Sequence, residues 1–280
     1  MNIIQSIILG IVQGLTEFLP ISSSAHLEVI PWLFRWQYFG KEFDVALHIG
    51  TFLGILVYYG KDVTAILRSF FQSFRDIRRI NTDPEMRLPW LIIVSSIPAI
   101  VVALALKDAI EEISDPEKTS FAILLTAICL IVFGIILAVA EKTGSKEKGI
   151  EAITFRDAVI IGLFQALALI PGVSRSGITM TSGLFLGQKR DSAANYSFLI
   201  SLPVIGGAAL YQCVEFFHDA GFQSQWALFL AGITASAVSG YLVVNFLLSY
   251  LKKGSFAVFV VYRIILGLVL IFSYFFMLPR

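Results

Sequence analysis

Gln13, Glu17 and Arg175 are polar side chains inside stretches that are otherwise almost wholly apolar. An ionisable group within a membrane helix costs about 2.5 to 3.5 kcal/mol on insertion scales, and it usually marks a pathway, an ion site or a reactive site. Gln13 and Glu17 are four residues apart, so they share one face of a helix. Two simpler interpretations stay open: a neutral Glu17 bonded within its own helix, and an Arg175–Glu17 pair that only ties two segments together.

Arg175 lies in a segment rich in Gly and Ser that has the chemistry of a phosphate site. Backbone N–H groups at a helix start and in such turns bind phosphate oxygens, and a guanidinium adds a planar fork that matches them. Because an ion pair alone would not need hydroxyls and glycines beside it, the segment favours an anionic ligand. The substrate-binding candidates here are Gly172, Ser174, Ser176 and Thr179.

A histidine, His26, follows a run of three serines at positions 22–24. It can act as a base, an acid or a nucleophile near neutral pH. Ser23 and His26 can share a face at the start of a helix, and Ser24 would serve as a cap or phosphate donor. Two routes stay open, in which either His26 attacks or activates water with help from Ser23, or Ser23 attacks with His26 as its base. The first is favoured, with His26 as the essential group and a hydrogen bond from Ser23 assisting it. His48 and His218 are predicted to be interfacial hydrogen-bonding residues.

The composition is that of a membrane protein. Of the 280 residues, 57% are apolar and 15% are charged, against about 45 to 50% and about 25% in ordinary soluble domains. The apolar residues are spread along the whole chain, which excludes a soluble enzyme with a single anchor and excludes disorder. A net charge of +1 gives no sign of a nucleic-acid partner. We therefore expect an all-α integral membrane protein.

Six stretches are long and apolar enough for a helix of about 20 residues to cross a bilayer: about 43–59, 88–106, 120–140, 195–215, 225–250 and 256–277. Two further apolar regions, about 2–38 and 156–187, are each interrupted by a cluster of Pro, Gly and Ser. Broken backbone at membrane depth needs protein or a water-filled cavity around it. Both regions are therefore predicted to be re-entrant helix-loop-helix hairpins whose tips meet in a pocket.

The two broken regions resemble each other. A Gly-x-x-Gln segment precedes each break, at residues 10–13 and 162–165, and three spans follow each hairpin. An odd number of crossings in each half inverts the second copy relative to the first. We therefore predict one membrane domain, 1–280, made of a first repeat at 1–140 and a second repeat of inverted topology at 156–280.

Lys and Arg are concentrated in one set of loops. With the N-terminus outside, the inside loops hold fourteen of these residues and the outside segments hold five, while Arg175 and Arg263 lie within apolar regions. Cytoplasmic loops carry the excess of Lys and Arg in membrane proteins. Both termini and the opening of the site are therefore predicted to face the outer, periplasmic side of a cytoplasmic membrane.

The segments 13–26 and 171–179 resemble the bacterial undecaprenyl-diphosphate phosphatase family, which is also known for bacitracin resistance. Gln13 and Glu17 match its motif of Glu or Gln, three residues and Glu, and residues 171–179 match P-G-x-S-R-S-x-x-T at every fixed position. The family's Ser and His after the first motif fall on Ser23 and His26. The resemblance continues through 43–47, 195–203 and 262–264.

This resemblance implies hydrolysis of a C55 polyprenyl diphosphate to the monophosphate and phosphate, which recycles the lipid carrier of cell-wall synthesis in the bacterial inner membrane. It implies catalytic roles for Glu17, Ser23, His26 and Arg175. It also implies that Glu17, with Gln13, holds a divalent metal, Mg²⁺ or Ca²⁺.

Two other classes of function stay open. Inverted repeats with broken helices and an anion site at the midplane are also a transporter plan, so a polyprenyl-phosphate flippase or an anion transporter is the main alternative. The third is an intramembrane serine protease using His26 with Ser174 or Ser23, although an arginine beside the serine suits phosphate better than a peptide bond. The expected partners are the polyprenyl diphosphate, membrane lipid and a second copy of the chain in a homodimer.

Overall fold

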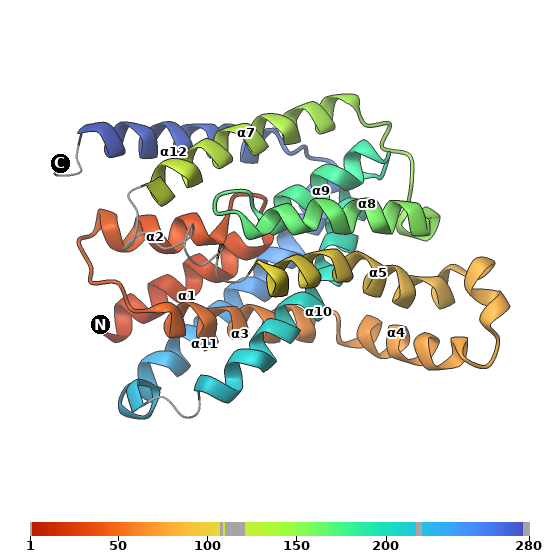
Figure 1. Ribbon diagram of the computed structural model, residues 1–280, viewed down its shortest axis with the longest axis horizontal. Helices are drawn as coiled ribbons and strands as arrows, with labels where there is room; N and C mark the ends of the chain where they lie inside the picture. The colour runs from red at the N-terminus through yellow and green to blue at the C-terminus, as the bar shows by residue number, and fades with distance from the viewer. Residues whose placement is uncertain (1, 107–108, 110–120, 217–219, 277–280) are drawn as a thin grey trace.

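The computed structural model describes residues 2–106, 109, 121–216 and 220–276. Within these ranges the regular elements are helices, and the β contact is an isolated bridge between Lys148 and Gln188. The predicted all-α class is confirmed (Figure 1). The elements are α1 (Ile3–Phe18), α2 (Ser23–Leu33), α3 (Lys41–Tyr58), α4 (Gly60–Ser73), η1 (Ile77–Asn81), α5 (Pro84–Ala105), α7 (Phe121–Thr143), η2 (Ile150–Ala152), α8 (Phe155–Ala166), η3 (Leu167–Leu169), α9 (Arg175–Phe185), α10 (Arg190–Phe216), α11 (Ala220–Leu251) and α12 (Ala257–Phe276).

Each predicted span coincides with one helix, namely α3, α5, α7, α10, α11 or α12. By length and composition, α5, α7, α11 and α12 can each cross a membrane, and α3 with α4, bent by 79°, would together form a fifth span. The chain is therefore a multi-pass membrane protein. Six complete crossings, and the repeat boundaries at 1–140 and 156–280, stay predictions.

The connection between the predicted spans 43–59 and 88–106, predicted to be an inside loop, contains α4 and η1. Val63, Ile66 and Phe70 recur at helical spacing, which is the pattern of an amphipathic helix. Val63 and Ile66 pack against the main core, and the Phe70 ring lies 5.2 Å, centroid to centroid, from that of Trp90 on α5. The packing of this partly buried apolar face explains why a helix forms where the charged residues had favoured a loop.

The two predicted hairpins are α1 with α2 and α8 with α9. Figure 1 shows that they enter the molecule from opposite ends and that their breaks meet near its middle. In the first hairpin α1 ends at Phe18 and α2 begins at Ser23, and in the second η3 ends at Leu169 and α9 begins at Arg175. The sequence analysis therefore placed both breaks correctly.

The two breaks have the same backbone geometry. Ser22 and Ser174, which directly precede α2 and α9, both have a φ of 72°, with ψ values of 100° and 113°. A positive φ is uncommon for a residue other than glycine. The buried side chains of Gln13 and Gln165 each stand nine residues before the respective serine. This shared geometry supports an internal repeat.

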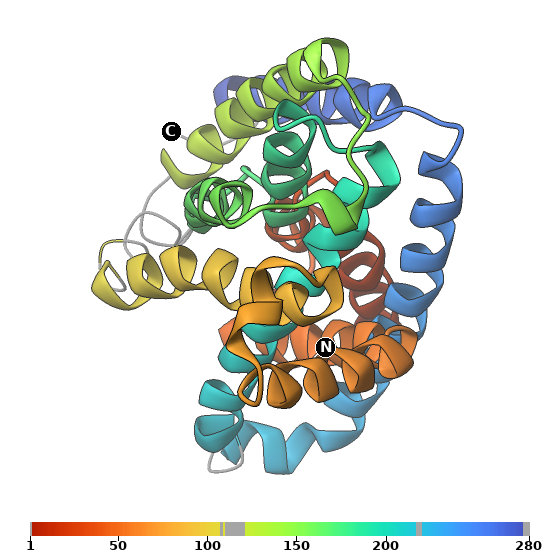
Figure 2. The ribbon, with the colours of Figure 1, turned by 90° about the vertical axis from the view of Figure 1, so that its right-hand side faces the viewer.

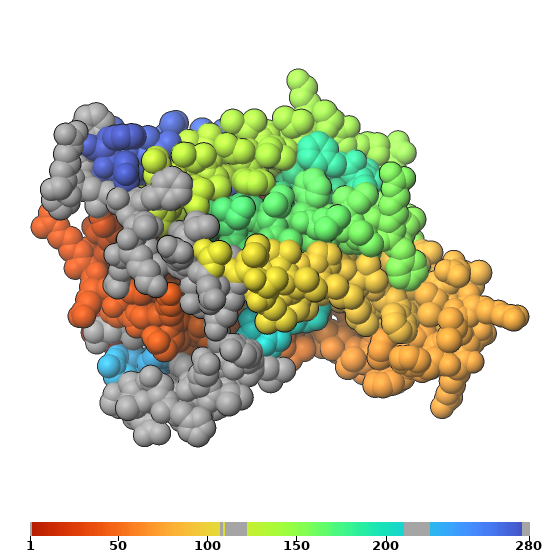
Figure 3. All heavy atoms as spheres, in the orientation of Figure 1, coloured from red at the N-terminus to blue at the C-terminus, as the bar shows by residue number. Residues whose placement is uncertain are grey.

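Two packing arrangements hold the hairpins in place. The first uses small residues: α11 packs along both α1 and α3, and a Cβ on Gly14 of α1 would lie 2.5 Å from the carbonyl oxygen of Ser236. The second holds α8 against α5, which lie side by side in Figure 3. The Ser95 hydroxyl donates to the Ala158 carbonyl at 2.9 Å, and the Gln165 amide donates to the Ser95 carbonyl at 3.0 Å. Each hairpin is thus fixed by a long helix beside it.

Candidate active site

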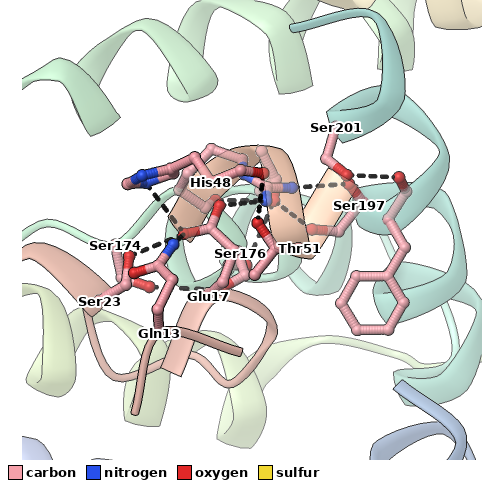
Figure 4. Close-up of polar contacts among 12 residues, drawn as sticks. Gln13, Glu17, Ser23, His48, Thr51, Ser174, Ser176, Ser197 and Ser201 are labelled. Atoms are coloured by element: carbon pink, nitrogen blue, oxygen red, sulfur yellow. Dashed lines mark hydrogen bonds and ion pairs between the residues drawn. The ribbon is translucent and has the colours of Figure 1, made fainter. Parts of the chain in front are cut away.

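Glu17 is the centre of a buried polar cluster drawn from both hairpins (Figure 4). Its carboxylate accepts hydrogen bonds from Ser23 Oγ at 2.8 Å, Arg175 Nη2 at 2.9 Å and Gln13 Nε2 at 3.1 Å. Only 8% of Glu17 is exposed. The ion pair between Glu17 and Arg175 is present, so the first alternative, a neutral Glu17 bonded only within its own helix, does not describe this site. An ionised carboxylate, which can only accept, suits this ring of donors.

Arg175 begins α9 and is held from a second side by α10. Its Nη1 donates to the carbonyl oxygen of Ser197 at 3.3 Å. The Thr179 hydroxyl donates to the Arg175 carbonyl at 2.8 Å and lies 2.6 Å from the Ser197 hydroxyl. The Ser197 carbonyl therefore helps to orient the Arg175 guanidinium, and Thr179 joins the start of α9 to Ser197 on α10. The guanidinium has five N–H donors, and those not used by Glu17 and Ser197 can bind an anion.

The remaining hydroxyls of the second break organise its backbone. Ser174 Oγ accepts from the Gly177 amide at 3.1 Å and so caps α9, while Ser176 Oγ donates to the Leu19 carbonyl at 2.9 Å and joins the two hairpin tips. Gly172 has a φ of 84°, and a Cβ there would lie 2.3 Å from the Thr126 carbonyl oxygen. These predicted binding residues lie at the site. Their contacts with the protein backbone hold the second break in its conformation.

His26 lies on α2, just after the first break, but bonds away from the Glu17 carboxylate. Its Nδ1 is 2.7 Å from the Ser22 carbonyl oxygen and its Nε2 is 2.6 Å from the Tyr262 hydroxyl. A carbonyl only accepts, so Nδ1 carries the proton, and in the neutral ring Nε2 accepts from the tyrosine. The predicted hydrogen bond between Ser23 and His26 is absent, because both ring nitrogens are occupied and Ser23 bonds to Glu17. Ser24 is exposed and pairs with Ser22 at 3.2 Å.

His48 is a site residue that the sequence analysis missed. It was predicted to be an interfacial residue, but its Nε2 lies 3.5 Å from Glu17 Oε2, and its Nδ1 bonds to the Asp44 carbonyl at 2.8 Å. The histidine comes from α3, outside the segments 13–26 and 171–179, and the packing of α3 beside α1 brings it to the carboxylate. His218 lies outside the described residues.

Arg263 on α12 holds the two breaks together. It is 1% exposed and donates to the carbonyl oxygens of Pro20 at 3.2 Å, Gly172 at 2.9 Å and Val173 at 3.0 Å. Non-helical backbone inside a membrane must have its carbonyl groups satisfied by protein or water. Arg263 meets this need for both hairpins with one guanidinium, and it thereby fixes the distance between Glu17 and Arg175.

The oxygen atoms around Glu17 suit a metal ion whose other ligands come from the substrate and from water. Gln13 Oε1 is buried and has no hydrogen-bond partner, and it belongs to the side chain beside the Glu17 carboxylate. Among the described residues no group of three or more His, Cys, Asp or Glu could hold a metal by itself. Mg²⁺ commonly binds through one or two protein oxygens plus substrate phosphates and waters. The residues present suit such an ion and do not form a closed protein cage.

The family described as "Bacitracin resistance protein BacA" matches residues 6–269. The chain belongs to this family. Its relatives include proteins named undecaprenyl-diphosphatase from Pelobacter propionicus, 47% identical over 268 residues that cover 95% of each chain, and from Thermomicrobium roseum, 43% identical over 272 residues that cover 97% of this chain and 98% of the relative. The protein of that name from Geotalea daltonii is 47% identical over 267 residues, 95% of this chain and 96% of its own.

The family resemblance inferred from the two motifs is therefore confirmed over nearly the whole chain. Both motifs of this BacA family member meet at one carboxylate. The first motif supplies Gln13 and Glu17, the second supplies Arg175, and the ion pair between them joins residues 158 positions apart.

Proposed function

We propose that this chain hydrolyses undecaprenyl diphosphate to undecaprenyl phosphate and inorganic phosphate. The observation that carries the proposal is the cluster of a carboxylate, a hydroxyl and a guanidinium at the meeting point of two broken helices in a membrane protein. Phosphoryl transfer depends mainly on positioning and charge stabilisation. The membrane helices suit a substrate with a long apolar tail, and Arg175 suits its diphosphate.

The contact between Ser23 and Glu17 supports attack by Ser23 and not the route through His26 that the sequence favoured, because both ring nitrogens of His26 bond to other groups. Ser23 Oγ attacks the terminal phosphorus while its proton passes to Glu17 Oε2, which lies 2.8 Å away. The bond from that phosphorus to the bridging oxygen breaks, and undecaprenyl phosphate leaves with the bridging oxygen. Water then attacks the phosphorus of the phosphoserine, the P–Oγ bond breaks, and Glu17 returns its proton to Ser23 Oγ while the protons of the water leave with inorganic phosphate. Arg175 stabilises the charge on the non-bridging oxygens, and His26 holds the break through Ser22 and Tyr262.

We further propose a divalent metal at this site, with Gln13 Oε1 and Glu17 as its protein ligands. A bound Mg²⁺ would stabilise negative charge on the phosphate oxygens. Mg²⁺ is preferred to Ca²⁺ because Mg²⁺ usually keeps several of its waters and binds through one or two protein groups plus substrate phosphates, which is the number of protein ligands present here.

Release of inorganic phosphate from undecaprenyl diphosphate by the purified chain in detergent tests the proposed function. A phosphatase releases phosphate without a sealed membrane. A flippase or an anion transporter would bind the lipid and release none, and that result would overturn the proposal.

Arg175→Lys should lower turnover by at least about tenfold, or about 1.4 kcal/mol. Lysine keeps the charge but lacks the planar fork that binds two phosphate oxygens together. Turnover per folded molecule, with folding checked by size exclusion and thermal unfolding, measures the effect. Arg156→Lys, an exposed site at the start of α8, is the matched control. If Arg175 only ties the hairpins together, the variant will lose thermal stability and keep its turnover.

We also propose that the protein lies in the bacterial inner membrane with both termini and the site opening on the periplasmic side. α1 begins and α12 ends at the same end of the molecule, and α4 and the connection from α7 to α8 lie at the other (Figure 1). The excess of Lys and Arg in the second set of segments supports a cytoplasmic position for that end. Assembly into a homodimer stays a prediction.

Cysteine labelling in intact cells tests this orientation. In a background with Cys129 and Cys213 replaced by Ala, a thiol reagent that cannot cross the membrane should label Lys41→Cys and leave Arg78→Cys unlabelled. Both positions are exposed. Labelling of Arg78→Cys alone would reverse the topology, and labelling of both in permeabilised cells is the control for reactivity. Glu112, which was also predicted to lie outside, falls beyond the described residues.

A further inference from the structure

A basic hollow of about 300 Å³ lies where α7 and α11 end and α10 begins. Its cationic side chains come from three segments far apart in the sequence, and its carboxylate is Asp191. The hollow shares no residue with the Glu17 cluster, so its role does not rest on the proposed function. Its lining residues are Lys146, Lys189, Arg190, Asp191, Leu251 and Lys252.

Main-chain hydrogen bonds hold two of these segments side by side. The amides of Glu147 and Lys148 both donate to the Gly187 carbonyl at 2.9 Å, and the Lys189 amide donates to the Lys148 carbonyl at 2.9 Å. Figure 2, which looks onto this end of the molecule, shows the segment that follows α7 running toward the start of α10. The cations are therefore brought together by fixed backbone.

The positive charge of the hollow is only partly balanced within the protein. Arg190 is paired with Glu141 on α7, with Nε 2.8 Å from Oε1. Lys146 donates to the carbonyl oxygen of Gly144 at 3.0 Å, a bond that leaves its charge uncompensated. Lys189 and Lys252 are exposed and form no ion pair within the described part of the chain. The lining of the hollow contains several cations and a single carboxylate, Asp191. This excess of positive charge favours an anionic ligand.

The position of the hollow relative to the membrane indicates where the anion comes from. The candidate spans on α7 and α11 end at Thr143 and Leu251, so Lys146 and Lys252 stand just beyond the apolar core of the bilayer, where lipid head groups lie. Basic pockets at such helix ends bind anionic head groups. A hollow of about 300 Å³ has room for a phosphate with part of its glycerol.

We infer that this hollow binds the phosphate of an anionic phospholipid from the membrane around it. Phosphatidylglycerol, which carries a net negative charge, should bind in preference to phosphatidylethanolamine, whose amine cancels the charge of its phosphate. Lys189 and Lys252 are the side chains that contact the head group, while Arg190, already paired with Glu141, shapes the wall.

Native mass spectrometry of the purified full chain, titrated with the two lipids of identical acyl chains, tests this inference. The double variant Lys189→Gln/Lys252→Gln should weaken phosphatidylglycerol binding by at least about tenfold, since each cation near a membrane surface contributes roughly fivefold. Lys142→Gln/Lys253→Gln is the matched control, because it removes the same charge from exposed positions at the ends of α7 and α11 that do not line the hollow. The control should change binding by less than about twofold.

Three results would overturn the inference. Equal loss in both double variants would mean diffuse surface charge, and equal binding of the two lipids would mean that the acyl chains are recognised. If inorganic phosphate binds the wild-type chain as tightly as phosphatidylglycerol does, the ligand is free phosphate and not a lipid. Partial displacement of phosphatidylglycerol by millimolar phosphate, lost in Lys189→Gln/Lys252→Gln, would support recognition of the phosphate group of the lipid.

Discussion

Ser23→Ala should lower the turnover of undecaprenyl diphosphate by at least about a thousandfold, because it removes the hydroxyl that attacks phosphorus. Binding of the lipid should change little, since Arg175 and the second break remain in place. Phosphate release measures turnover, and retention of radiolabelled lipid by the purified protein measures binding. Ser145→Ala, an exposed serine in the connection after α7, is the control for loss of a hydroxyl.

A trapped intermediate separates the two routes that the sequence left open. If Ser23 attacks, rapid acid quenching of the wild-type chain with substrate labelled on the terminal phosphate should leave label on Ser23, and mass spectrometry should locate it. His26→Ala should then keep more activity than Ser23→Ala. A dead His26→Ala variant beside an active Ser23→Ala variant would instead support attack by His26, with Tyr262 moving off Nε2.

Glu17→Gln should lower turnover by about a hundredfold to ten-thousandfold, the range for loss of a positioned general base. The amide keeps the size of the side chain but cannot take the proton of Ser23, and it leaves Arg175 without its counter-ion. Phosphate release and thermal unfolding should be measured together, because an unpaired buried charge also destabilises the fold. Glu42→Gln, an exposed carboxylate in the first turn of α3, is the matched control.

The same variant tests the metal. A chelator should abolish wild-type turnover and added Mg²⁺ should restore it, whereas the residual turnover of Glu17→Gln should need much more Mg²⁺. Binding of Mn²⁺ followed by electron paramagnetic resonance gives a readout that does not depend on activity. Unchanged activity in chelator, together with an unchanged Mn²⁺ signal in Glu17→Gln, would contradict a metal held by Gln13 and Glu17.

The histidines show where local spacing stops being informative. Ser23 and His26 are three residues apart, which allowed a shared face and a direct hydrogen bond. His26 instead pairs with Tyr262, 236 positions away, and the two rings are nearly parallel, with a centroid distance of 5.6 Å. His48, predicted to be interfacial, faces Glu17 because α3 packs beside α1.

The sequence by itself determined the membrane class, the two breaks and the residues Gln13, Glu17 and Arg175 of the site. Three local properties carry this information: the length of each apolar stretch, the interruptions by Pro, Gly and Ser, and a charge among apolar neighbours. In a bilayer, unsatisfied backbone groups and unpaired charges cost so much free energy that each of these properties restricts the structure strongly. Only the tertiary structure decided the partners of His26, His48 and Arg263. A hydrogen bond requires two atoms to approach within about 3 Å in the right direction, and for residues on different helices the packing of those helices sets that approach.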